Sequence, residues 1–227
     1  MKYCYFIFLF IIFSCSPNKL IFKENFSNNK NQWDILDNKD FKVLVDSGVY
    51  QITKKIKNFD SRGCLWLTKE MKKFSSSDNF SISFDIRVLN QKDDAKFFDF
   101  MWGNINLKSN LKKEIQFYQI QISEDQIKLN QFGYQDERKQ NGWTSVARGI
   151  DGLYKNYFLN KWHNIQILQL NSELIIYRDQ IEIFRSKIKP TEGNMIGIQN
   201  CIKIEIQVDN LIITKLKVNN IEKTNPQ

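Results

Sequence analysis

The segment Phe80–Val88 has the sequence FSISFDIRV, in which five apolar residues alternate with four polar ones without an exception. Successive side chains of a β-strand point to opposite faces of its sheet, so this pattern predicts a strand with one buried and one solvated face. The segment Ile202–Asp209, with the sequence IKIEIQVD, alternates in the same way. Both segments are therefore expected in antiparallel sheets that face water on one side.

Further apolar runs indicate about a dozen short strands, whereas no window carries the i, i+3, i+4, i+7 stripe of an amphipathic helix. The additional predicted strands are Phe41–Val45, Gly48–Thr53, Cys64–Thr68, Lys96–Trp102, Ile115–Ile122, Gln126–Phe132, Ile165–Leu170, Glu173–Arg178 and Met195–Gln199. A tight hairpin is predicted at Asp179-Gln180, and the shift of apolar phase between Phe117 and Tyr118 indicates a β-bulge or two buried faces. Short strands at this spacing without helices predict an all-β, antiparallel two-sheet β-sandwich.

The N-terminal segment predicts export. Lys2 precedes ten apolar residues, Cys4–Phe13, a run about half as long as the ~20 residues that span a bilayer. The run ends in Ser14-Cys15, which resembles the bacterial lipobox and implies acylation of Cys15. We therefore expect a signal peptide at 1–14, a lipid-anchored tether at 15–20, one β-sandwich domain at 21–216 and a polar tail at 217–227. An uncleaved signal anchor, or a secretory peptide in which Cys15 is incidental, is the alternative.

The charge of the chain does not indicate a nucleic-acid partner. The formal net charge is +8, but 27 of the 33 basic residues are lysines, and they are scattered among 25 acidic residues. Base and phosphate recognition favours the planar fork of arginine. A solvated, lysine-rich surface explains the charge better.

Cysteine and histidine are too few for a recognisable metal site. After export, Cys64 and Cys201 remain, and an oxidising compartment permits a disulfide between them, although separate burial stays open. No C-x-x-C spacing exists, and His163 is the only histidine. Asp93, Asp94 and Asp99 could form a calcium site with loop carbonyls, but a calcium loop normally needs more oxygen ligands than this stretch has. No cofactor is therefore assigned, and calcium stays open.

Short motifs in the second half of the chain carry a family resemblance. The segment Trp162-His163-Asn-Ile-Gln-Ile, followed by Leu174-Ile-Ile-Tyr-Arg-Asp179, resembles a stretch of the concanavalin A-like and laminin G-like jelly rolls. The segments Phe22–Phe26 and Val208–Ile213 are similar to the opening and closing strands of such domains in exported bacterial proteins. The resemblance covers about residues 20 to 216 and implies a fold in which His163 is structural. Gln180 stands where the family usually has a glycine.

No catalytic motif is present in the sequence. Glycosidases on this fold carry the pattern E-x-D-x-E, because alternate residues of one strand face the same cleft. No two of the 25 acidic residues are separated by a single residue, and neither G-x-S-x-G nor a P-loop occurs. An exported glycoside hydrolase-like enzyme that brings carboxylates together from separate strands stays open, as does a structural or protein-interaction protein of the envelope.

The sequence favours a non-catalytic binding protein of the bacterial cell envelope, with a carbohydrate as the leading ligand and a protein as the next. Residues Gly133–Trp143 are predicted to form a long polar loop, the kind of segment that carries function on a rigid sandwich. The candidate contact residues in this loop are Tyr134, Asp136, Arg138, Asn141 and Trp143. Packing of Trp143 at the sandwich end is the alternative, and the other four tryptophans are expected to pack in the core, namely Trp33, Trp66, Trp102 and Trp162.

Overall fold

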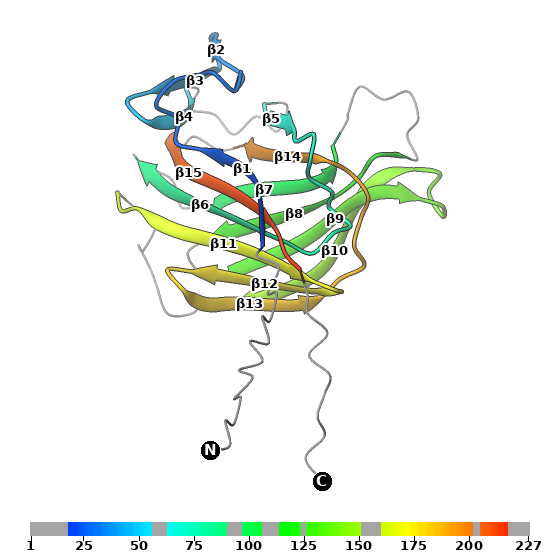
Figure 1. Cartoon of the computed structure of the whole chain (residues 1–227). Helices are drawn as coiled ribbons and strands as arrows, with labels where there is room; N and C mark the ends of the chain where they lie inside the picture. Colours follow the sequence, from blue (N-terminus) through cyan, green and yellow to red (C-terminus); the bar gives the residue numbers. More distant parts are fainter. Residues whose placement is uncertain are drawn as a thin grey trace, which may run out of the picture.

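The computed structural model describes residues 18–55, 63–89, 97–105, 114–123, 126–150, 160–201 and 205–217. The described residues form two antiparallel sheets that pack face to face, without any α-helix (Figure 1). The signal segment, Cys15, Asp93, Asp94 and residues 218–227 lie outside the described residues. No helix of the described residues is long and apolar enough to cross a membrane.

The larger sheet contains nine of the fifteen described strands. Its strand order is β13 (Ile181–Lys187), β12 (Glu173–Arg178), β11 (His163–Leu170), β6 (Phe80–Leu89), β15 (Glu205–Lys215), β4 (Val49–Lys54), β3 (Phe41–Asp46) and β2 (Leu36–Asp37). In addition, β1 (Lys19–Glu24) pairs with β15, so the first strand begins two residues inside the segment expected to be tether. The two ends of the described chain therefore lie side by side (Figure 1).

The smaller sheet contains the other six strands. Its order is β10 (Gln140–Ile150), β9 (Gln126–Gln135), β8 (Gln116–Ser123), β7 (Phe97–Asn104), β14 (Met195–Asn200) and β5 (Leu65–Glu70). All of these pairings are antiparallel. The strands β5 and β10 are therefore the two edges of this sheet.

The core lies between the two sheets and follows directly from the alternation in the sequence. Every second residue of β6, from Phe80 to Val88, is buried, and the residues between them are half-buried on the outer face. Phe84 stacks on Phe100 of the opposite sheet with ring centroids 4.9 Å apart. Each such fully buried aromatic or aliphatic side chain contributes about 1.5–3 kcal/mol, so the two interlocking apolar faces dominate the stability of the fold.

A buried carboxylate organises the N-terminal part of the sandwich. Glu24 at the end of β1 is 2% exposed, and its Oε1 accepts hydrogen bonds from the backbone N–H groups of Asn25 and Phe26. Its Oε2 accepts hydrogen bonds from the Asn31 amide and from Trp33 Nε1, at 2.5 and 3.0 Å. Four donors thus satisfy one carboxylate where the chain turns into the core, which offsets the cost of burying its charge.

The hairpin between β12 and β13 turns at the predicted residues. Asp179 and Gln180 have φ angles of 50° and 70°, so both central positions are left-handed, as a type I′ turn requires. Asp179 Oδ2 lies 2.7 Å from His163 Nδ1, and its Oδ1 accepts a hydrogen bond from the backbone N–H of Asn164. His163 is 4% exposed and therefore ties the start of β11 to this turn.

Where they are described, the predicted strands correspond to strands of the structure with ends that differ by at most three residues, but four features were missed or predicted only in part. β2 and β10 were not predicted, and β1 was indicated only by the family resemblance at Phe22–Phe26. β15 continues to Lys215, beyond the alternation that ends at Asp209 and beyond the closing-strand resemblance that ends at Ile213. The phase shift at Phe117-Tyr118 reflects two buried faces, because the pairing of β8 with β7 and β9 shows no register shift there. Phe117 belongs to a second apolar cluster on the far side of the smaller sheet.

Candidate functional site

The candidate site is the outer face of the smaller sheet, which points away from the inter-sheet core. The register of the strands places alternate residues on this face. Its main members are Trp66, Asp99, Met101, Phe117, Gln119, Gln121, Asn130, Phe132, Trp143, Met195 and Gln199. Aromatic and amide side chains thus predominate on a face that a simple sandwich would cover with charges.

This face is concave. Trp66 lies on β5 and Trp143 on β10, the two edge strands of the sheet, yet their ring centroids are only 6.3 Å apart. In a flat sheet the five strand spacings between these edges would hold their backbones about 24 Å apart. The sheet must therefore curl so that its edges and their indole rings approach each other across the outer face.

Four aromatic side chains form a rigid cluster in this concavity. The ring of Trp143 lies 5.0 Å from Phe132 and 5.5 Å from Phe117, and Phe117 lies 5.9 Å from Trp66. Most of these contacts are edge-to-face, the geometry that aromatic quadrupoles favour. Trp143 nevertheless keeps 42% of its surface exposed. The cluster therefore holds the Trp143 ring in one orientation while part of the ring faces solvent.

A shallow pocket of about 580 Å³ adjoins the exposed side of Trp143. Its lining residues come from the tip of the β9–β10 hairpin and the adjoining part of β10, and are Gln135, Asp136, Glu137, Arg138, Trp143, Thr144 and Ser145. The pocket combines one aromatic surface with carboxylate, guanidinium, amide and hydroxyl groups. Such a combination suits a ligand that has an apolar ring face and several hydroxyl groups.

The predicted long loop at Gly133–Trp143 is wrong, because these residues form a β-hairpin. β9 extends to Gln135, β10 begins at Gln140, and only four residues make the turn. Strand pairing in this hairpin involves mostly Gln, Asn, Thr and Ser, so the apolar alternation that reveals a strand is absent. Lys139 has a φ of 51°, which closes the turn in the left-handed region.

The structure divides the five candidate contact residues into two groups. Asp136, Arg138 and Trp143 line the pocket together. Tyr134 and Asn141 are partners in the β9–β10 ladder, on the same face as Trp143, and both are half-buried. Asn141 Oδ1 is buried and accepts no hydrogen bond from the described residues. These two residues therefore support the hairpin beside the pocket and do not line it.

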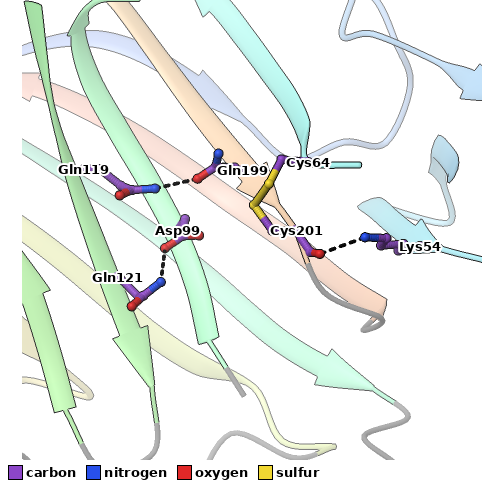
Figure 2. Close-up of a disulfide and its surroundings, with 7 residues drawn as sticks. All are labelled: Lys54, Cys64, Asp99, Gln119, Gln121, Gln199 and Cys201. Atoms are coloured by element: carbon purple, nitrogen blue, oxygen red, sulfur yellow. Dashed lines mark hydrogen bonds between the residues drawn. A yellow bond between two sulfur atoms is a disulfide. The ribbon is translucent and has the colours of Figure 1, made fainter. Parts of the chain in front are cut away.

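A row of buried and half-buried polar side chains lies on the concave face, on β7, β8 and β14 (Figure 2). Gln121 Nε2 donates to Asp99 Oδ1 at 3.2 Å, and Gln119 Nε2 donates to Gln199 Oε1 at 2.5 Å. Asp99 is only 1% exposed. Burial raises the pKa of Asp99 to about 7, and the hydrogen bond from Gln121 lowers it only in part. Asp99 is therefore a carboxyl group that gains or loses its proton near neutral pH.

A disulfide closes one end of this row. Cys64 and Cys201 are bonded, with their Cα atoms 4.0 Å apart, one register position beyond the Leu65–Asn200 pair of β5 and β14 (Figure 2). The carbonyl of Cys201 accepts a hydrogen bond from Lys54 Nζ of the larger sheet at 2.8 Å. The bond thus holds the edge strand β5, which carries Trp66, against its neighbour.

Comparison with known proteins shows the fold. No known protein family matches the chain, and no curated protein matches its sequence. A Bacillus subtilis protein of unknown function with a galectin-like fold superposes with a TM-score of 0.63 at 6% identity, over 88% of this chain and 98% of that one. The kappa-carrageenase of Pseudoalteromonas carrageenovora, solved with an oligotetrasaccharide of kappa-carrageenan, superposes with a TM-score of 0.55 at 8% identity, over 91% and 99%. The laminarinase catalytic domain of Thermotoga maritima gives 0.54 at 12%, over 88% and 99%.

The chain has a concanavalin A-like jelly-roll fold. The predicted two-sheet antiparallel β-sandwich is confirmed, and so is the resemblance to concanavalin A-like domains inferred from the short motifs. Identities of 6 to 12% carry this likeness no further than the fold.

On the concave face, no second carboxylate of the described residues lies in register beside Asp99. The register neighbours of Asp99 on this face are Gln199 and Gln121. One acidic cross-strand pair, Asp85 with Asp209, occurs on the outer face of the larger sheet instead. The oxygens of Asp85 accept hydrogen bonds from the side-chain amides of Asn164 and Asn210. Retaining glycoside hydrolysis needs two carboxyl groups about 5–5.5 Å apart, whereas the described cross-strand neighbours of Asp99 on this face are amides.

The described residues contain no group of three or more His, Cys, Asp or Glu side chains that could hold a metal ion. Two of the three aspartates of the candidate calcium site, Asp93 and Asp94, lie outside the described residues. The third, Asp99, is directed into the amide row described above.

The expectation that the other four tryptophans pack in the core is correct for two of them. Trp33 and Trp102 are 8% and 0% exposed in the inter-sheet core. Trp66 lies on the concave face, and Trp162 is 39% exposed, with the Arg87 guanidinium 4.7 Å from its ring centroid. The prediction for Trp66 was wrong because β5 carries apolar residues on both of its faces, so the sequence does not show which face packs in the inter-sheet core. The apolar phase shift at Phe117 was the one sequence signal of the second cluster.

Proposed function

We propose that this protein is a non-catalytic, glycan-binding lipoprotein of the bacterial cell envelope. The observation that carries the proposal is the exposed ring of Trp143, fixed by an aromatic cluster and bordered by a polar pocket of about 580 Å³. Sugar rings present apolar faces that stack on indole, together with hydroxyl groups that bind carboxylate, amide and guanidinium groups. An aromatic ring that is already immobilised loses little conformational entropy on binding.

The fold supports a glycan as the ligand class. Two proteins with the same fold are a kappa-carrageenase, solved with an oligotetrasaccharide of kappa-carrageenan, and a laminarinase catalytic domain. In this chain the concave face carries a single buried described carboxylate, Asp99, among amide side chains. Such a face offers hydrogen bonds to hydroxyl groups, which supports binding over cleavage.

We further propose that Cys15 is the lipid attachment point. Ser14-Cys15 follows the apolar run Cys4–Phe13, and β1 begins only four residues after Cys15. Two or three acyl chains hold a protein stably at a membrane, because each buried methylene contributes about 0.8 kcal/mol. A short tether would then hold the domain, with its glycan site, at a membrane of the cell envelope.

A glycan array tests the binding proposal. The Trp143→Ala variant should lose at least tenfold in affinity for any glycan that the unchanged protein binds. The matched control is Trp162→Ala, which removes a similarly exposed indole that directly precedes β11 of the other sheet. Equal binding by all three proteins contradicts the proposed site. Binding to envelope proteins but to no glycan favours a protein ligand, and glycan shortening that depends on Asp99 favours an enzyme.

A further inference from the structure

One end of the sandwich concentrates exposed lysines around the point where the chain enters the fold. The first and last described strands meet there, since Lys19 of β1 is paired with Lys215 of β15. We call this surface the basic end, and its members are Lys19, Lys72, Lys73, Lys215 and Lys217, all of them exposed. Leu20, next to Lys19, is 57% exposed and is one of the most exposed large apolar residues described.

The basic end is held together by specific contacts between four segments. The backbone N–H of Leu216 donates to the carbonyl of Asn79, and that of Lys217 donates to Asn18 Oδ1. The segment 71–79 runs from the end of β5 to the start of β6 and thus closes this end of the sandwich. Lys72 and Lys73 share a shallow pocket of about 310 Å³ with Ile21 and Phe22 of β1.

Among the described residues, three carboxylates lie on or beside the segments that carry these lysines. Lys215 Nζ pairs with Asp78 at 2.7 Å, and Glu70 Oε1 accepts a hydrogen bond from the Asn194 amide. Glu192 is exposed and lies between Thr191 and Gly193, whose carbonyls both accept hydrogen bonds from Ser76 of the 71–79 segment. Five lysines and these three carboxylates give the basic end a net charge of about +2. An exposed leucine among lysines is the composition of a surface that contacts the headgroup region of an anionic membrane.

We propose that the basic end docks on a bilayer that contains anionic phospholipid, an inference that rests on the proposed anchor at Cys15. Only two residues separate Cys15 from Asn18, so the chain between their Cα atoms can extend by about 10 Å at most. Electrostatic attraction to a charged surface decays over about 8 Å at physiological ionic strength. The anchor therefore holds Lys19 and its neighbours within the range at which anionic headgroups attract them.

Lysine labelling on vesicles tests this docking surface. The full-length lipidated protein is placed in vesicles of phosphatidylcholine alone, or with 30 mol% phosphatidylglycerol as the probe, and is exposed to a membrane-impermeant amine-acylating reagent. Lys19, Lys72 and Lys73 should react about fivefold more slowly in the anionic vesicles, the factor expected for one lysine near such a surface. Raising the salt concentration to about 1 M, where the Debye length is about 3 Å, should remove the difference.

Lys39 and Lys42 provide an internal control. Lys42 of β3 is paired with Thr53 of β4, and Thr53 is paired with Glu205, the first residue of β15. Ten residues of β15 separate Glu205 from Lys215, so Lys42 lies about 33 Å along the strand direction from Lys215. Both control lysines should react equally in the two kinds of vesicle. The double variant Lys72→Glu with Lys73→Glu should abolish the protection of Lys19, whereas Lys39→Glu with Lys42→Glu should leave it intact.

Equal labelling of Lys19, Lys72 and Lys73 in both kinds of vesicle would overturn the docking surface. Failure of the anchor is observed separately, by mass spectrometry of the peptide that contains Cys15. A chain without acyl groups still allows the labelling comparison, because the apolar run Cys4–Phe13 holds it on the vesicles. Glycan binding is measured separately through Trp143, so a failure of any one of the three proposals can be distinguished from a failure of the others.

Discussion

Replacing Asp99 by asparagine should make the protein more stable at neutral and alkaline pH. In the unfolded chain this carboxyl group ionises at its ordinary value of 3.8, whereas burial raises its pKa to about 7 in the folded protein. Between these two pH values the folded protein binds one more proton than the unfolded chain, so the free energy of unfolding falls as the pH rises. Below 3.8 and above 7 this group contributes no slope.

The two pKa values set the size of the effect. Each pH unit between them corresponds to about 1.4 kcal/mol, so Asp99 destabilises the folded protein by up to about 4 kcal/mol at pH 8 relative to pH 3.8. Asparagine keeps the acceptor for Gln121 Nε2 and replaces the protonated oxygen by an amide of the same shape. The Asp99→Asn variant should therefore lack this loss of stability on going from pH 4 to pH 8.

Urea unfolding followed by tryptophan fluorescence measures the effect, at intervals from pH 4 to pH 8.5 and with the disulfide intact. The control is Asp46→Asn, which removes an exposed carboxyl group at the end of β3 without changing the buried row. The informative quantity is the difference in unfolding free energy between Asp99→Asn and the unchanged protein. If that difference is the same at pH 4 and pH 8, Asp99 is ionised throughout and the reasoning about its burial fails.

Three further substitutions, one of them with a matched control, test the fold by urea unfolding. A Cβ on Gly193, which has a φ of 143°, would lie 2.1 Å from the Gly103 carbonyl carbon, so Gly193→Ala should cost about 3 kcal/mol or more. The same change at Gly133, where the nearest atom would be 3.5 Å away, should cost less than about 1 kcal/mol, and equal costs would refute the packing argument. Gln180→Gly should stabilise the protein by about 1 kcal/mol, because the residue has a φ of 70°, and no gain would mean that the turn is not strained. Glu24→Ala should cost about 3–5 kcal/mol, since it leaves four donors unpaired, and a cost under 1 kcal/mol would show that water replaces the carboxylate.

The larger part of the sandwich could be predicted because its strands alternate strictly. The β6 pattern assigned Phe80, Ile82, Phe84, Ile86 and Val88 to the core, and all five are buried. Strand β10 was missed because a polar edge strand shows no such alternation. Strand β2 was missed because it has only two residues.

The candidate site was predicted only in part. Trp143, Asp136 and Arg138 were selected for their exposed aromatic and polar character, and the structure brings them together in one pocket. Trp66 was assigned to the core, and the phase shift at Phe117 left a β-bulge or two buried faces open, because sequence alternation does not distinguish the inter-sheet core from a second apolar cluster on the outer face.

The sequence by itself determined the fold class, because the period of two in apolar residues forces extended strands to bury one face against another sheet. It also determined which residues turn the β12–β13 hairpin. Only the tertiary structure decided that the smaller sheet curls, that its two edge tryptophans meet, and that Asp99 lies buried at the centre of that face. These features depend on contacts between residues far apart in the chain, whereas local alternation reports only which way each side chain points.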